Sequence, residues 1–274
     1  MRQRPPLLAA AMAALWSLTA AAGHAQVVEN PCAGAPVRPR AVSDYLAATL
    51  IFRNTRAPAL LPEVLAYRAA LDKAKIEDWA NLCQYRADDL RLAAGPAAGR
   101  RIVFIGDSIT ELWGLADPAF FSGGRVNRGI SGQTTGQILL RFQADVVALH
   151  PRAVHILAGT NDLAGNTGPE SMVDVHNNIA AMVALAKANG IRVYLASVPP
   201  ARRFNWRPDL SPAAQVRELN TWLRAFAKAQ RVTYVDYYSA LTDTTGGLRA
   251  ELSADGVHPD AAGYRLMAAA VPKD

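Results

Sequence analysis

Several short polar segments follow apolar runs of strand length, the last of them after a long loop, and carry the side chains that acyl transfer requires. They are residues 106–110 (GDSIT), 129–134 (GISGQT), 159–162 (GTND) and 255–259 (DGVHP). Ser108 can act as a nucleophile once a base takes its proton, and Asp255, three residues before His258, can orient such a base. Because ligands of an open parallel sheet bind beyond the carboxyl ends of its strands, these segments can share one edge. Together they predict an acyl-transfer site.

Each of these residues also has a purely structural interpretation. A serine such as Ser108 is an ordinary helix N-cap, and Asn161 can stabilise a turn through its own side chain. Gly129 and Gly132 suit turns, and Asp255 suits the start of a helix. The glycine spacing matches neither the dinucleotide-binding fingerprint nor a Walker loop. From the residues alone, both interpretations remain open.

From Arg101 onward, strand-like runs alternate with helical stretches. The expected strands are residues 102–105, 125–130, 154–158, 191–197 and 232–236. The expected helices are residues 134–149, 169–189, 212–229 and 260–270. This alternation is typical of a parallel sheet with helices on both faces. We therefore expect an α/β fold over residues 100–274: a three-layer α/β/α, flavodoxin-like domain with a five-stranded parallel sheet.

The chain before this domain has a different character. Residues 1–25 have the layout of a secretory signal peptide: early arginines, an apolar run over residues 7–22 and small residues at positions 23 and 25, before a cut at Gln26. A buried first helix or an uncleaved anchor is the alternative. Residues 26–99 are expected to form a helical N-terminal extension, in which Pro62 suits the first turn of a helix.

Cys32 and Cys83 both lie after the predicted cut. Two cysteines in an exported chain favour one disulfide, which would close a loop of about 50 residues and stabilise the fold by about 4 kcal/mol. Two unpaired thiols are the alternative. Neither cysteine has the spacing of a zinc site, so no metal is expected.

Charge and hydropathy narrow the classes of partner. The chain has 29 Lys+Arg against 23 Asp+Glu, a net charge of +6, but the basic residues are scattered, so nucleic acid is not an expected partner. No window of about 18 uninterrupted apolar residues follows residue 30, so the mature chain is not expected to span a membrane. An apolar fraction of 51% is enough to build a buried core.

The runs IVFIGDSIT, NRGISGQTT, LAGTND and DGVHPDAAGY together resemble the motif blocks of the SGNH (GDSL) hydrolase family, in order along residues 101–270. The likeness is to the branch that includes the platelet-activating-factor acetylhydrolase catalytic subunits and bacterial lysophospholipase-like esterases. Ile109 stands where the family name has leucine, which is common in this branch. Residues 26–95 lie outside the resemblance.

The resemblance implies a role for each candidate residue. Ser108 would be the nucleophile, His258 the general base and Asp255 the group that orients His258. The backbone N–H groups of Ser108 and Gly132, with the side-chain amide of Asn161, would form the oxyanion hole. The resemblance implies no cofactor and no metal.

We therefore expect an exported serine esterase, periplasmic or extracellular, that hydrolyses carboxylic esters through an acyl-enzyme on Ser108. Its substrate would be a small-molecule, glycan or lipid ester. Carbohydrate acetylesterase activity, and lysophospholipase or thioesterase activity, are the alternatives among enzymes. A glycan- or lipid-binding module on an inactive hydrolase fold is the alternative from another class, against which the complete residue set argues. The sequence leaves the acyl length, the alcohol and the oligomeric state open.

The loop after the expected fourth strand, residues 199–211 (PPARRFNWRPDLS), is a candidate for substrate selection. The aromatic faces of Phe204 and Trp206 can pack on sugar rings or acyl chains, and the arginines beside them can pair with phosphate or carboxylate. Trp113, five residues past Ser108, is a further candidate for the same rim. The alternative is a solvated basic loop with Trp206 tucked onto the domain.

Overall fold

The computed structural model describes residues 30–54, 62–95 and 101–273. The chain divides into two compact units, Met1–Ala33 and Gly34–Asp274. Of the first unit, residues 30–33 are described, and there the Asn30 side chain accepts a hydrogen bond from the Cys32 N–H (3.2 Å). The predicted signal peptide, residues 1–25, lies outside the described residues. The elements described below belong to the second unit.

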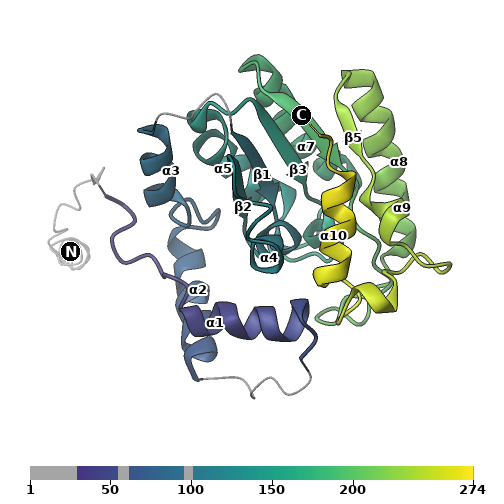
Figure 1. Ribbon diagram of the computed structural model, residues 1–274, viewed down its shortest axis with the longest axis horizontal. Coiled ribbons are helices and arrows are strands. Elements are labelled where there is room, and N and C mark those ends of the chain that lie inside the picture. Colours follow the sequence, from purple (N-terminus) through teal and green to yellow (C-terminus); the bar gives the residue numbers. More distant parts are fainter. Residues whose placement is uncertain (1–29, 55–61, 96–100, 274) are drawn as a thin grey trace, which may run out of the picture. The chain divides into compact units, whose positions relative to one another are not determined.

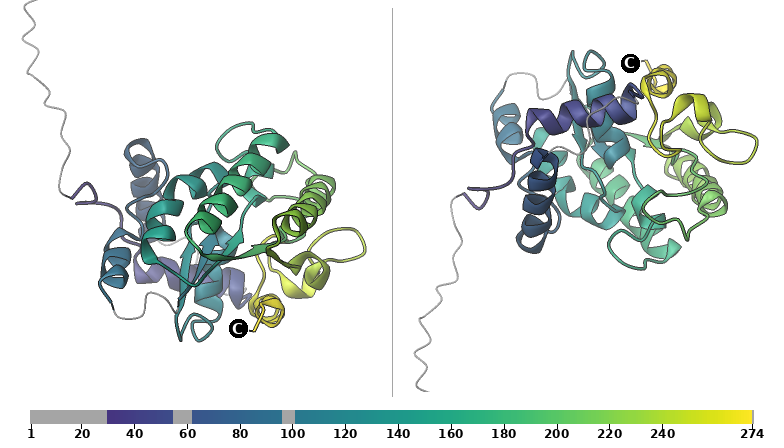
Figure 2. Two further views of the ribbon diagram at one scale, coloured as in Figure 1. Left: turned by 90° about the horizontal axis from the view of Figure 1, so that it is seen from above. Right: turned by 90° about the horizontal axis from the view of Figure 1, so that it is seen from below.

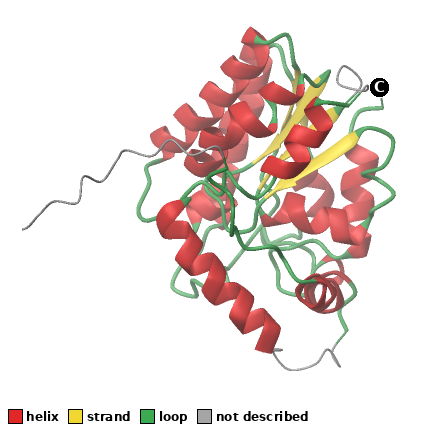
Figure 3. Cartoon of the chain, turned by 90° about the vertical axis from the view of Figure 1, so that its left-hand side faces the viewer, coloured by secondary structure: helices red, strands yellow, loops and turns green. Residues whose placement is uncertain are grey.

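Strands of the second unit form one parallel sheet of five, in the order β2-β1-β3-β4-β5. They are β1 (Ile102–Gly106), β2 (Arg125–Gly129), β3 (Ala153–Leu157), β4 (Arg192–Ala196) and β5 (Thr233–Val235). Every residue of β1 and β3 is buried, as in parallel strands covered on both faces. Helices enclose the strands on two sides (Figure 3). The predicted three-layer α/β/α fold with five parallel strands is confirmed.

Different helices cover the two faces of the sheet (Figures 1 and 2). One face packs against α5 (Thr135–Asp145), α7 (Met172–Ala188) and α8 (Ala213–Gln230), and the other against α4 (Ser108–Ala116), α9 (Tyr237–Leu241) and α10 (Ala261–Ala270). Val103 of β1 belongs to the first core and Phe104 to the second, because successive strand residues point to opposite faces. Burying such a side chain contributes about 1.5–3 kcal/mol. Strand β1 is therefore fixed from both sides, and so is the position at which it ends.

Side-chain caps set the starts of the helices near the carboxyl edge of the sheet. Asp107 caps α4 through the Ile109 N–H (2.9 Å), and Asp260 caps α10. Thr134 and Ser171 open capping boxes on α5 and α7. Each cap is worth about 1 kcal/mol and fixes where a loop ends. A short helix, α6 (Thr160–Leu163), follows β3 at the same edge, and 3₁₀ turns occupy Val147–Leu149 and Ala250–Leu252.

Residues 34–95 carry further helices. They are α1 (Arg40–Leu46) with a π-helical continuation (Ala47–Ile51), α2 (Pro62–Glu77) and α3 (Arg86–Ala93). Pro62 begins α2, as predicted, because its missing N–H has no partner to lose in the first turn. Ile51 is buried in the core that includes α4, whereas Val64 and Tyr67 of α2 form a small cluster with α1.

Cys32 and Cys83 are disulfide-bonded, so the predicted bridge is confirmed. Within the described ranges, no helix combines the length and the apolar character needed to cross a membrane.

Candidate active site

Helix α4 begins directly after β1, which places Ser108 at the carboxyl edge of the sheet. Because Asp107 supplies the N-cap, Ser108 is the first residue of the helix and not its cap. Its Oγ lies 2.9 Å from Nε2 of His258. Asp107, and not Ser108, is therefore the helix cap. The Ser108 hydroxyl faces the His258 imidazole instead.

Asp255 and His258 extend this contact into a continuous chain of hydrogen bonds. Nδ1 of His258 lies 2.6 Å from Oδ2 of Asp255. The other carboxylate oxygen accepts hydrogen bonds from the main-chain N–H groups of His258 (2.8 Å) and Val257 (2.9 Å). A carboxylate on Nδ1 holds the imidazole in the tautomer whose Nε2 can accept a serine proton. The arrangement is that of an activated nucleophile, its base and a group that orients the base.

The Asp255 carboxylate is ionised at all pH values well above its lowered pKa, which includes neutral pH. Burial alone raises its pKa, but the hydrogen bond and charge of His258, with the main-chain N–H donors, outweigh burial and lower the pKa of Asp255 to about 2. An ionised carboxylate at this position can stabilise an imidazolium formed during a reaction.

The loop that carries Asp255 and His258 is held by its own hydrogen bonds. Ser253 Oγ donates to the His258 carbonyl (2.7 Å) and accepts from the Gly256 N–H (2.8 Å). Gly256 has a φ of 78°, a conformation that favours glycine. Val257 is buried in a small apolar cluster with Phe204 from the loop after β4. The loop after β4 therefore supports the loop that presents the base.

The predicted oxyanion-hole residues come together at the same edge. Gly132 has a φ of 82°, and Asn161 is buried. Nδ2 of Asn161 donates to the Gln133 carbonyl (3.0 Å) and approaches Oδ2 of Asp107 (3.3 Å). Asn161 thus contacts the neighbours of both Gly132 and Ser108.

A network that the sequence analysis missed holds the Asn161 side chain. Asn166 Nδ2 donates to Oδ1 of Asn161 (2.8 Å) and to the Gly132 carbonyl (3.2 Å). Oδ1 of Asn166 accepts a hydrogen bond from Nε1 of Trp206 (3.0 Å). Asn166 was missed because a single asparagine in a loop is usually interpreted as a turn residue. The signal that could have indicated its role is its position five residues after Asn161.

The structure corrects two of the predicted substrate-binding residues. Trp113 is 0% exposed and packs on Phe104 of β1, because five residues are about 1.4 helical turns and carry it round to the sheet side of α4. Phe204 is also 0% exposed and stacks beneath Trp206, with ring centroids 5.1 Å apart. Trp206, at 42% exposed, is the predicted candidate that a substrate can reach.

Asp107 is a further buried group at the site that the sequence analysis did not single out. Burial raises its pKa to about 6, although the Ile109 N–H and the charge of His258 act in the other direction. The Asp107 carboxylate therefore links the start of helix α4 to the Asn161 side chain.

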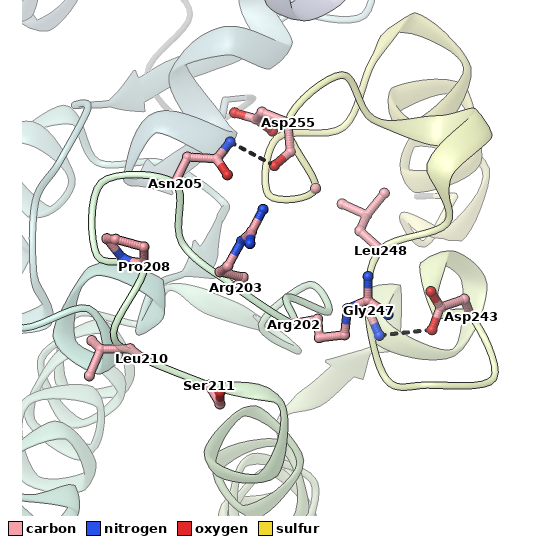
Figure 4. Close-up of a pocket in the computed structure, with 11 residues that line it drawn as sticks. Arg202, Arg203, Asn205, Pro208, Leu210, Ser211, Asp243, Gly247, Leu248 and Asp255 are labelled. Carbon is pink, nitrogen blue, oxygen red and sulfur yellow. Dashed lines mark hydrogen bonds between the residues drawn. The ribbon is translucent and has the colours of Figure 1, made fainter.

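A pocket of about 370 Å³ adjoins Asp255, between the loop after β4 and the loops around residues 243–256 (Figure 4). Arg202, Arg203 and Asn205 line one side of it, and Asp243 lines the other. The carboxylate of Asp243 already accepts hydrogen bonds from its own loop, and that of Asp255 is bonded to His258. Arg203 extends into the pocket and makes no hydrogen bond or ion pair with the residues that the structure describes. The pocket therefore offers an unpaired positive charge.

The groups gathered at the site are those of nucleophilic and acid–base chemistry. Across residues 30–54, 62–95 and 101–273, no three His, Cys, Asp or Glu side chains gather as ligands for a metal ion.

Comparisons with known proteins agree with the geometry. The profile of the GDSL-like Lipase/Acylhydrolase family matches residues 104–266, more than half of the chain. A GDSL-like lipase of Bacteroides thetaiotaomicron is similar in structure, with a TM-score of 0.68 and 42% identity over 70% of this chain and 95% of that one. Esterase TesA of Pseudomonas aeruginosa is 27% identical over 62% of this chain and 85% of its own length. Axe2, an acetylxylan esterase of Geobacillus stearothermophilus, shares the fold at 22% identity over 64% of this chain and 94% of that one, with a TM-score of 0.53. The family resemblance inferred from the motifs is therefore confirmed: the chain belongs to the GDSL-like lipase/acylhydrolase family and is an ester-bond hydrolase.

Proposed function

We propose that this protein is a serine esterase that hydrolyses carboxylic esters through an acyl-enzyme on Ser108. The observation that carries the proposal is the hydrogen-bonded chain from Ser108 Oγ to His258 Nε2 (2.9 Å) and from His258 Nδ1 to Asp255 Oδ2 (2.6 Å). A serine hydroxyl is a weak nucleophile until a positioned base accepts its proton, and this chain supplies that base.

In the acylation step, Ser108 Oγ attacks the ester carbonyl carbon while His258 Nε2 takes the serine proton. The carbonyl oxygen becomes an oxyanion and accepts hydrogen bonds from the N–H groups of Ser108 and Gly132 and from the Asn161 amide. Asp255 stabilises the imidazolium. The bond between the carbonyl carbon and the alcohol oxygen then breaks, and the alcohol leaves with the proton from His258.

In the deacylation step, a water molecule takes the place of the alcohol. His258 accepts a proton from this water as its oxygen attacks the acyl-enzyme, and the same donors stabilise the second oxyanion. The carbon–oxygen bond to Ser108 breaks, the carboxylic acid leaves, and Ser108 recovers its proton from His258.

The proposal predicts that Ser108→Ala and His258→Ala each abolish ester turnover without unfolding the protein. Because both residues act in one proton transfer, the double variant should be no slower than either single variant. A fluorophosphonate probe should label the wild type and an exposed-serine control, Ser122→Ala, but not Ser108→Ala. A clearly slower double variant would contradict the shared step. An unlabelled wild type would favour the binding-module alternative.

The pocket beside Asp255 supports a finer proposal for the substrate: an ester whose alcohol part carries an anionic group. The unpaired guanidinium of Arg203 extends into this pocket, next to the loop that presents His258. A phosphate or carboxylate on the alcohol would pair with it, since guanidinium groups match such anions. Lysophospholipids and acidic acetylated sugars have such a group, whereas neutral acetylated sugars, the class suggested by the Axe2 likeness, do not.

A matched pair of esters tests this preference. We expect the wild type to hydrolyse 4-acetoxybenzoate with a higher kcat/KM than the neutral 4-acetoxybenzamide, and we expect added salt to reduce the difference. Arg203→Gln should lower kcat/KM for the anionic ester by about 3-fold, the size expected of an exposed ion pair, and leave the neutral ester unchanged. Arg231→Gln, at the far end of α8, is the charge-matched control. Equal effects of Arg203→Gln on both esters would refute the anionic preference.

We also infer that the protein is exported. A leader-like segment at residues 1–25 and the Cys32–Cys83 disulfide both support an oxidising compartment. Mass spectrometry of the protein from a periplasmic or medium fraction should find Gln26 as the first residue. An intact N-terminus on cytosolic protein would refute export.

A further inference from the structure

The described part of the N-terminal extension within the second unit, residues 34–54 and 62–95, lies outside the family match, yet several of its groups bond to one loop of the active site. We propose that this extension is a positioning element that holds the oxyanion loop, residues 129–133, in its catalytic conformation. The inference rests on the proposed role of Gly132 as an oxyanion donor.

Tyr85 holds the first residue of the oxyanion loop. Its hydroxyl donates a hydrogen bond to the Gly129 carbonyl, and its ring lies under the guanidinium of Arg128, 4.6 Å from centroid to Cζ. Arg128 is itself bound by Asp88 and Asp89 at the start of α3 (2.7 Å and 2.8 Å). The extension therefore binds the end of β2 through the Tyr85 side chain and two carboxylates.

Backbone carbonyls of the extension hold the other end of the loop. Gln133 Nε2 donates to the Ala80 carbonyl (2.8 Å), and Gln137 Nε2 donates to the Trp79 carbonyl (2.7 Å). Gln133 is buried, and its own carbonyl accepts the hydrogen bond from Asn161. If the turn that carries Ala80 moved, Gln133 would move with it and would displace the Asn161 side chain that is bonded to it.

An ion pair links the extension to the middle of the loop. Arg38 bonds to Glu111 of α4, whose side chain is 6% exposed. The second oxygen of Glu111 accepts hydrogen bonds from the N–H (2.9 Å) and the hydroxyl of Ser131. Without Arg38, Glu111 would be a buried carboxylate lacking its cationic partner, and such a group drives rearrangement of its surroundings.

These contacts matter because Gly132 cannot fix its own conformation. It has a φ of 82° and no side chain, so its N–H points where its neighbours place it. Glu111 binds the residue before Gly132, and Ala80 binds the residue after it. A displacement of catalytic groups by about 1 Å can cost a reaction about 100-fold in rate. The extension is therefore placed to set kcat without touching the substrate.

The test uses the full-length protein and two variants that act through different contacts. Arg38→Met removes the charge that balances Glu111, and Tyr85→Phe removes one hydroxyl while keeping the ring on Arg128. We expect each to lower kcat by about 10-fold with KM within about 2-fold of wild type. Binding of a trifluoromethyl ketone, which forms a tetrahedral adduct on the serine, should weaken by the same factor. Arg38→Lys should recover part of the loss.

Arg40→Met is the matched control, because Arg40 lies on the same segment with a 94% exposed side chain. All rates are divided by the number of sites that react with a fluorophosphonate, so unfolded protein does not count. If both test variants keep the wild-type kcat per site while Asn161→Ala is slow, the extension plays no positioning role and the proposed function stands. If Asn161→Ala is also as fast as wild type, the oxyanion assignment itself fails. A rise in KM with unchanged kcat would also overturn the inference, since the extension would then contact substrate.

Discussion

Two carboxylates of the site, Asp107 and Asp255, respond to their surroundings in opposite directions. Partners lower the pKa of Asp255 to about 2, so it contributes stability above its ordinary pKa of 3.8 and loses that contribution as the pH falls towards 2. Burial raises the pKa of Asp107 to about 6, so the folded state holds a proton there more tightly than the unfolded chain does. Ionising Asp107 between about pH 4 and pH 6 therefore destabilises the fold.

This difference predicts a pH-dependent effect of Asp107→Asn. Asparagine also caps helices but does not ionise, so the variant should lack the loss of stability that Asp107 causes between pH 4 and pH 6. A pKa raised from 3.8 to about 6 corresponds to a loss of stability on the order of 2–3 kcal/mol. Urea unfolding of both proteins at pH 4, 5 and 6 measures it. Parallel curves across this range would show that Asp107 keeps an ordinary pKa.

Asn161 allows the oxyanion assignment to be tested at a single donor. Asn161→Ala should lower kcat by about 10²–10³-fold with little change in KM, the usual result of removing one such donor. Its carbonyl partner Gln133 and its donor Asn166 would lose a hydrogen bond, so thermal melting is measured beside the kinetics. A lower melting temperature with a near wild-type rate per active site would mean that Asn161 only shapes its turn.

Burial patterns determined which helices and strands could be predicted from the sequence. A continuous apolar run predicted β1, and a mostly apolar run predicted β3, each to within one residue. The apolar stripe of α7 predicted that helix. The turn around residues 78–85 and the short helix α9 were not predicted, because segments of a few residues contain too little periodicity to identify. These segments are ordered by contacts with distant parts of the chain.

The same limit separates the site residues that could be predicted from those that could not. Ser108 and His258 were found because each stands in a motif and at a predictable sheet edge. Asn166 and Asp107 act through hydrogen bonds between loops, and their nearness in sequence to Asn161 and Ser108 does not by itself reveal those bonds. Trp113 was misplaced because its side depends on the exact residue at which α4 begins, and caps decide that residue.

The proposed function gives the loop after β4 two roles, contact with the substrate and support of Asn161 through Asn166. Variants of Trp206 can test these two proposed roles separately. Trp206→Phe keeps an aromatic face but removes the N–H that bonds to Asn166. We expect this variant to lower kcat on every ester by a few-fold, since a neutral hydrogen bond is worth about 1 kcal/mol, with KM unchanged. Trp206→Ala should in addition raise KM for a natural-size substrate more than for a small acetate ester.

Kinetics on two esters of different size check both statements. Arg231→Gln, at the C-terminal end of α8, serves again as the control, because it lies outside the loop after β4. If Trp206→Phe matches wild type in kcat, the Trp206–Asn166 hydrogen bond does not support the oxyanion side. If Trp206→Ala changes KM equally for both esters, the loop does not select the substrate.

The active site depends on contacts between residues that are far apart in sequence. Ser108 and His258 are separated by 150 positions, and Arg38 reaches Glu111 across 73. Such contacts form when the compact unit folds as one, and each must offset the entropy of closing a long loop. Restraints on the unfolded chain therefore bear directly on how much of the protein is active.

The Cys32–Cys83 disulfide is such a restraint, and its removal should lower stability more than it lowers the rate of the folded enzyme. It closes a loop of about 50 residues, so replacing both cysteines by alanine should cost about 4 kcal/mol and about 10 °C in melting temperature. Scanning calorimetry of the oxidised wild type and the double variant measures the change. Dithiothreitol should lower the melting temperature of the wild type towards that of the variant and leave the variant unaffected, which separates loss of the bridge from side effects of the substitutions. Equal melting temperatures for oxidised wild type and variant would show that the bridge adds no stability, and that non-covalent contacts are enough to hold the extension on the domain.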